Sequence, residues 1–207
     1  MQKVVTRWMA PVIFIAAASL APRLVTAQDA PVTIDAVAVS MGGPTMRSGT
    51  AQVTLRIDRW STDDELAKLK DAVVEKGDDA LLSALQHTKP VGSLSTNGGL
   101  GWDIHYAQRV ALPGGGWRIT FATDRPMSFG ERVNSTRSRD YEYLVGEVRV
   151  GADGKGAGKL VPRAGVMYDA ENNTLTIENY DSYPVGLSNV RLTTNKRASA
   201  GQVPSGR

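Results

Sequence analysis

The chain has 207 residues, with 24 Lys and Arg against 21 Asp and Glu, and a formal net charge of +3 at pH 7. It has no cysteine, which excludes disulfides, thiolate metal sites and a cysteine nucleophile. Three basic residues (Lys3, Arg7 and Arg23) and no acidic residue lie before residue 28, so the remainder balances at 21 basic and 21 acidic residues. This balance gives no general attraction to polyanions, and a nucleic-acid partner is not expected.

The first 27 residues have the segment order of a secretory signal peptide. Lys3 and Arg7 precede an apolar run at 9–21, and small residues follow up to Ala27. The run is shorter than the roughly 20 residues of a membrane span, and no later segment reaches that length. We therefore expect an exported chain, periplasmic or secreted, with one domain over 28–194 and a loose polar tail over 195–207.

The mature chain opens with strand-like patterns. A short apolar stretch covers 32–39, and a cluster of two glycines and Pro44 ends it. From Thr50 to Trp60, apolar and polar residues alternate, which is typical of a half-buried strand.

A pair of helices is predicted directly after this strand. Thr62 and Glu65 have the spacing of a capping box, and acidic residues occupy the first turn. Leucines at helical spacing continue the pattern until Gly77, which is expected to break or kink the helix. A second, shorter helix is predicted over 78–86.

The pattern beyond residue 90 is typical of β structure. Period-two runs at 102–110 and 117–121 flank a turn with three glycines, which gives the clearest hairpin of the chain. Further strands are predicted at 141–150, 159–161, 166–168, 174–180 and 185–192. These strands indicate an α+β fold that is mainly antiparallel β, a sandwich or a barrel, with the short helical pair inserted after an early strand.

The two histidines are the first candidates for chemistry. His87 falls at the end of the second predicted helix, where an imidazole interacts favourably with the last carbonyls. Asp103 and His105 are two apart on a predicted strand, so both project from one face, where a carboxylate beside an imidazole can bind a metal or orient a base. That face is opposite the apolar residues of the strand and is expected to be exposed to solvent. Two ligands also fall short of the three that a catalytic zinc site takes from a protein.

The segment 125–140 follows neither the helical nor the strand period, although the other connections are short. Loops of this length in a compact domain are often functional and otherwise disordered. Clustered guanidinium groups can hold a carboxylate, a phosphate or an acidic sugar, whereas Glu131 and Asp140 dilute the charge and favour a solvated loop. The candidate binding residues are Arg125, Phe129, Arg132, Arg137 and Arg139.

Other motifs of catalysis and cofactor binding are weak. Serines occur without a nucleophile elbow, and the acidic pairs at 63–64 and 78–79 are explained by helix capping. The glycine runs at 114–116 and 151–156 lie between strands and read as hairpin turns, because a phosphate-binding loop leads from a strand into a helix. No cofactor is predicted.

Five segments of the chain resemble a group of uncharacterised exported proteins from soil bacteria. The segments are Arg56–Asp63, Ala122–Phe129, Gly156–Leu160, Ile177–Tyr180 and Ser188–Val190. The resemblance covers nearly all of the mature chain and implies a bacterial exported protein. Because the group has no assigned activity, it implies no catalytic or binding residue.

The sequence therefore favours a non-catalytic binding or structural module of the bacterial envelope or the extracellular space. Its partner would be an envelope component, an extracellular protein or a glycan. The alternative is a small hydrolase or metal-dependent enzyme centred on Asp103 and His105.

Overall fold

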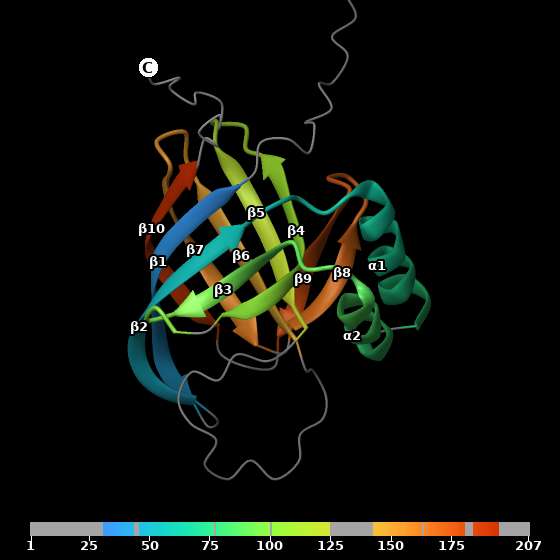
Figure 1. Cartoon of the computed structure of the whole chain (residues 1–207), viewed down its shortest axis with the longest axis horizontal. Coiled ribbons are helices and arrows are strands. Elements are labelled where there is room, and N and C mark those ends of the chain that lie inside the picture. The colour runs from blue at the N-terminus through green and yellow to red at the C-terminus, as the bar shows by residue number, and fades with distance from the viewer. Residues whose placement is uncertain are drawn as a thin grey trace, which may run out of the picture.

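The computed structural model describes residues 31–43, 46–76, 78–99, 101–124, 143–162, 164–180 and 184–194. They form a closed eight-stranded barrel, a two-stranded sheet and a pair of helices (Figure 1). The elements are β1 (Val32–Gly43), β2 (Met46–Ile57), α1 (Asp63–Lys76), α2 (Asp78–His87), β3 (Gly92–Thr96), β4 (Trp102–Ala111), β5 (Trp117–Thr123), β6 (Leu144–Val150), β7 (Lys155–Pro162), β8 (Ala164–Asp169), β9 (Thr174–Tyr180) and β10 (Val185–Thr194). The predicted α+β class, mainly antiparallel with a helical pair after an early strand, is confirmed, and the sheet is a barrel.

The barrel is built from neighbouring strands of the sequence. Strands β1 to β6 each pair antiparallel with the next, and β10 closes the barrel between β7 and β1. The hairpin β8–β9 leaves the barrel between β7 and β10 and forms its own sheet. The five-residue β3 was not predicted, because its sequence, Gly-Ser-Leu-Ser-Thr, has a single large apolar residue.

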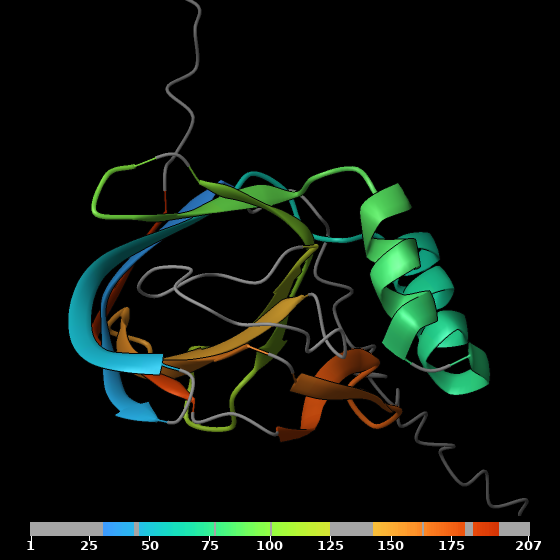
Figure 2. The same cartoon turned by 90° about the horizontal axis from the view of Figure 1, so that it is seen from below.

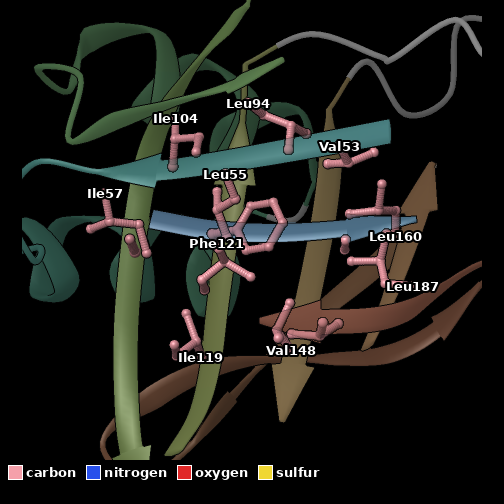
Figure 3. Close-up of a cluster of buried hydrophobic side chains, with 14 of the residues drawn as sticks. Val53, Leu55, Ile57, Leu94, Ile104, Ile119, Phe121, Val148, Leu160 and Leu187 are labelled. Atoms are coloured by element: carbon pink, nitrogen blue, oxygen red, sulfur yellow. The ribbon is translucent and has the colours of Figure 1, made fainter. Parts of the chain in front are cut away.

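Apolar side chains fill the interior of the barrel (Figure 3). An eight-stranded barrel has an interior just wide enough for side chains to fill. Leu55, Leu94, Ile119 and Phe121 are among the residues with at most 2% of their surface exposed. Gly146 faces Phe121 across β5 and β6, and a methyl group at Gly146 would overlap the Phe121 ring. The interior is therefore a packed core.

A second apolar core lies between the outer wall of the barrel and the helical pair. Leu66 and Leu69 of α1 and Leu81 and Leu85 of α2 are buried in it, together with barrel residues such as Tyr106 and residues of β8–β9. The helices and β8–β9 stand side by side against the same side of the barrel (Figure 2). Within the described residues, neither helix has the length and apolar character needed to cross a membrane.

The predicted capping box at the start of α1 is confirmed. The Thr62 hydroxyl accepts the Glu65 backbone N–H at 3.2 Å, and the Glu65 carboxylate accepts the Thr62 backbone N–H at 2.9 Å. The Arg59 guanidinium also donates to both carboxylate oxygens of Glu65, each at 2.8 Å. The hydrogen bonds from Arg59 hold the pKa of the Glu65 carboxyl below its usual value. Helix α1 is thereby fixed to the chain that leaves β2.

A β-bulge in β4 places the side chains in the second half of that strand on the faces opposite to those predicted. The pairing with β5 shifts between Ile104 and Tyr106, so one extra residue stands in β4. Ile104 lies in the barrel core, Tyr106 lies in the outer core, and Ala107 returns to the barrel core. The prediction of one uninterrupted alternation over 102–110 is therefore wrong, because the extra residue moves every later side chain to the other face.

Candidate functional site

His105 stands at the bulge and is buried, with 6% of its surface exposed. Its Nδ1 lies 2.7 Å from the backbone oxygen of Thr88, which can only accept, so Nδ1 carries the proton. Its Nε2 is buried, lies 3.5 Å from Oδ1 of Asp124, and has no hydrogen-bond partner among the described residues. The expectation of a solvent-facing His105 is wrong, because the segment that follows α2 covers the imidazole.

Asp103 differs from His105 in its surroundings. Asp103 is exposed and pairs with Ser93 of β3, while the carboxylate beside His105 is that of Asp124. Among the described residues, no group of three or more histidine or acidic side chains is placed to hold a metal ion. The buried imidazole joins the segment after α2 to β4 and to Asp124, which directly follows β5.

The bulge also turns Arg109 into the barrel, where it lies opposite Ile119. Its guanidinium carbon lies 5.1 Å from the centroid of the Trp60 ring and 4.3 Å from that of Trp117. These are cation–π distances, and the arginine is half-buried. This cluster was not predicted, because the apparent alternation of the strand places Arg109 on the solvent face.

A buried hydroxyl network ties the outer face of β4 to β9. The Tyr106 hydroxyl lies 2.9 Å from Oε1 of Gln108 and 2.8 Å from Oγ1 of Thr174, and it accepts the backbone N–H of Leu175 at 3.0 Å. Burial raises the pKa of Tyr106 to about 12. The hydroxyl is therefore a neutral connector between the barrel and β8–β9.

Replacing Tyr106 by phenylalanine is expected to lower the free energy of unfolding by about 1–3 kcal/mol, because Thr174 and the Leu175 N–H lose their partner in a dry site. The pH profile gives a second readout. A phenol whose pKa is higher in the folded than in the unfolded state stabilises fully below pH ~10 and loses this contribution as pH rises towards 12. Urea unfolding between pH 7 and 11 should show a steeper alkaline loss for the parent than for Y106F.

Tyr168→Phe is the matched control for this prediction. The Tyr168 hydroxyl donates to Asn173 at 2.8 Å in an exposed position, so its removal should change the free energy of unfolding by less than about 0.5 kcal/mol. Equal losses for Y106F and Y168F would contradict the connecting role of Tyr106.

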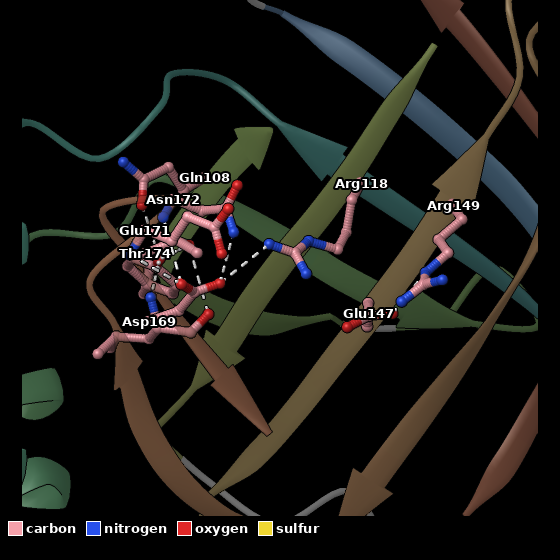
Figure 4. A network of polar contacts seen from close by, with 10 residues as sticks. Gln108, Arg118, Glu147, Arg149, Asp169, Glu171, Asn172 and Thr174 are labelled. Carbon is pink, nitrogen blue, oxygen red and sulfur yellow. Dashed lines mark hydrogen bonds and ion pairs between the residues drawn. The ribbon is translucent and has the colours of Figure 1, made fainter. Parts of the chain in front are cut away.

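Charged side chains form a network on the outer face of β5 and β6 and on the turn between β8 and β9 (Figure 4). Arg118 reaches Asp169 at 3.4 Å, and Arg149 donates through Nε to Glu147 at 2.9 Å. Hydrogen bonds from the Asn172 side chain lower the pKa of the Asp169 carboxyl. Arg118 and Arg149 stand directly opposite each other on adjacent strands. This pair was not predicted from the sequence, because no local pattern shows that β5 pairs with β6 or in which register.

A groove of about 500 Å³ runs between the two helices on their side away from the barrel. It is lined by Lys68, Asp71, Ala72, Ala80, Ser83, Ala84 and His87. His87 ends α2 and its Nδ1 lies 2.7 Å from the Ser83 carbonyl oxygen, which confirms its predicted helix-end role. The groove is shallow, and its small side chains follow from the close approach of two helices.

The candidate binding residues of the 125–140 segment are not placed by the structure. Arg125, Phe129, Arg132, Arg137 and Arg139 lie outside the described residues, as do the predicted signal peptide and the tail. The described chain resumes at Tyr143, which is buried in the outer core.

No family model, no curated protein and no solved structure matches this chain. The resemblance to exported proteins of soil bacteria stays a prediction.

Proposed function

We propose that this protein is a non-catalytic binding module, exported to the periplasm or the extracellular space, that holds its partner on the outer surface of the barrel. The observation that carries the proposal is the packed interior. Apolar side chains occupy the space in which a barrel of larger bore would hold a ligand or a reaction centre. Charged side chains lie outside it, and among the described residues Arg149 contacts Glu147 through Nε alone.

The surroundings of His105, the residue on which the enzymatic alternative depends, also favour a binding module over an enzyme. A general base must reach the proton that it removes. The Nε2 atom of His105 is buried, and Nδ1 is engaged by a backbone carbonyl. The exposed Asp103 does not share that environment.

Export is tested with the full coding sequence carrying a C-terminal tag in a bacterial host. We expect the protein in the periplasmic or culture fraction with Gln28 as its first residue. Ile15→Arg, which places a charge in the apolar run, is the control and should hold the chain in the cytoplasm uncleaved. An uncleaved parent chain in the cytoplasm would contradict the proposal.

Binding is tested with the exported product, incubated with insoluble glycans and with envelope fractions. Retention without release of soluble sugars or peptides is expected. Turnover of a glycan or peptide that is lost in H105Q would favour the enzyme, and failure to retain any component would count against a binding module.

A further inference from the structure

Four basic side chains form a band across the outer face of four consecutive barrel strands: Arg118 of β5, Arg149 of β6, Lys155 of β7 and Arg191 of β10. Their outward facing follows from the pleat, because Arg118, Arg149 and Arg191 each adjoin a residue of the barrel core, and Lys155 lies directly opposite Arg191. We call this set the basic band. It concentrates positive charge on one wall of a protein whose charges balance over residues 28–207 as a whole.

The basic band contains two like-charged cross-strand pairs. Arg118 lies opposite Arg149, and Lys155 lies opposite Arg191. Like charges in directly opposed positions destabilise a sheet unless a counter-charge compensates them. Arg149 lies opposite Ala157 of β7, so the two pairs are offset by two residues along that strand. A wall that holds both pairs is suited to an anionic partner.

Neighbouring carboxylates satisfy only part of the hydrogen-bonding capacity of the basic band. Arg118 contacts Asp169 through Nη2, and Arg149 contacts Glu147 through Nε. Within the described residues, these are the side-chain contacts of the two arginines. The remaining guanidinium N–H groups of Arg149 can still donate, whereas the Arg118 side chain is 18% exposed and adds mainly positive charge. The Arg149 side chain is 63% exposed, and Lys155 and Arg191 are exposed as well.

Asp35 is the acidic border of the basic band on the β1 side, where it pairs with Arg191. The Asp35 carboxylate also accepts the Thr54 hydroxyl at 2.8 Å. Asp169 and Asp35 thus lie at the two ends of the band, and Glu147 lies within it beside Arg149. The four basic side chains outnumber these three acidic ones, and a ligand is expected to lie across the strands.

We propose that the basic band binds the carboxylates of an acidic polysaccharide. The inference rests on the proposed binding function and names its ligand class. Neighbouring strands lie ~4.8 Å apart, so the three steps from β5 to β10 place positive charges along about 14 Å, a length suited to a linear chain with recurring charges. Arginine forks match planar carboxylates.

Other polyanions fit the surface less well. Docking to a lipid surface is aided by apolar side chains that insert into it. The large apolar side chains that are exposed in the described structure (Met41, Val74 and Met167) lie on β1, α1 and β8, and none belongs to the four strands that carry the basic band. None of these is aromatic, whereas single-stranded nucleic acid is held by stacking on exposed rings.

The experiment measures the affinity of the exported full-length product for polygalacturonate and for its fully methyl-esterified form at low salt. The parent is expected to bind the acidic polymer, to lose affinity as salt rises, and to ignore the ester. R149Q/R191Q is expected to weaken binding about tenfold, because two guanidinium groups and their positive charges are removed. The control K68Q/K89Q removes two exposed positive charges from the helical side and should bind like the parent.

Each contrary outcome has a distinct meaning. Three results would overturn the assignment of the basic band. They are equal binding of the ester, an equal loss of affinity in both double variants, and a preference for phosphatidylglycerol vesicles or duplex DNA. Retention on a neutral glycan alone would overturn it and leave the proposed binding function standing. Release of cleaved sugar would overturn the proposed function itself. Circular dichroism melts establish that each variant is folded.

Discussion

Replacing Gly146 by alanine is expected to destabilise the protein by about 1–3 kcal/mol, although alanine is favoured over glycine in most strands. The physical reason is the ring of Phe121, which lies opposite Gly146 and occupies the volume that a Cβ would need. The Phe121 ring is fully buried in the barrel interior, so it has no free space into which to move. Urea unfolding followed by tryptophan fluorescence measures the loss.

A double-mutant cycle separates overpacking from other effects of the substitution. F121L should destabilise by itself, because it leaves part of the ring volume empty. In G146A/F121L the new methyl group enters that space, so the double variant should be more stable than the sum of the single losses predicts. We expect a coupling of about 0.5–3 kcal/mol between these contacting residues.

Gly49→Ala is the matched control for this prediction. Gly49 also lies in a barrel strand, but it is exposed and no atom stands near the position of its missing Cβ. G49A is expected to change stability by less than about 0.5 kcal/mol, and it can gain slightly because alanine restricts the unfolded chain. Equal losses for G146A and G49A would show that strand glycines are required for another reason.

The sequence predicted much of this fold because its strongest patterns are local. The alternation before Trp60, the capping box at Thr62 and Glu65, and the glycine turn before Trp117 each depend on residues close together in the chain. The structure confirms a strand, a helix start and a hairpin at these places. Local patterns do not show whether such strands form a sandwich or a barrel, because the pairing of β10 with β1 joins residues 147 to 162 positions apart.

The candidate site was harder to predict because it depends on a single extra residue. The bulge at His105 could not be predicted, because the residues before it and the residues after it each fit an alternating strand pattern. It places Tyr106 in the outer core and Arg109 inside the barrel. The basic band is non-local in the same way, since its members come from four strands and only their register brings them together.

Replacing Leu69 by alanine is expected to lower the free energy of unfolding by about 2–5 kcal/mol, the range for large-to-small changes in a dry core. Leu69 is fully buried between α1, α2 and the outer wall of the barrel. Because β4 contributes to both cores through Tyr106 and Ile104, we expect the helical pair and the barrel to unfold together. Urea unfolding followed by helical circular dichroism and by tryptophan fluorescence should give one coincident transition, shifted to lower urea with an unchanged slope.

Val74→Ala is the matched control, because Val74 lies on the same helix and is 66% exposed. Its removal of apolar volume should change stability by less than about 0.5 kcal/mol. An early loss of helical signal in L69A, with the fluorescence transition unmoved, would contradict a shared cooperative unit. In that case the helical pair is a separately stable layer, and the contacts of His105 with Thr88 and Asp124 do not couple it to the barrel.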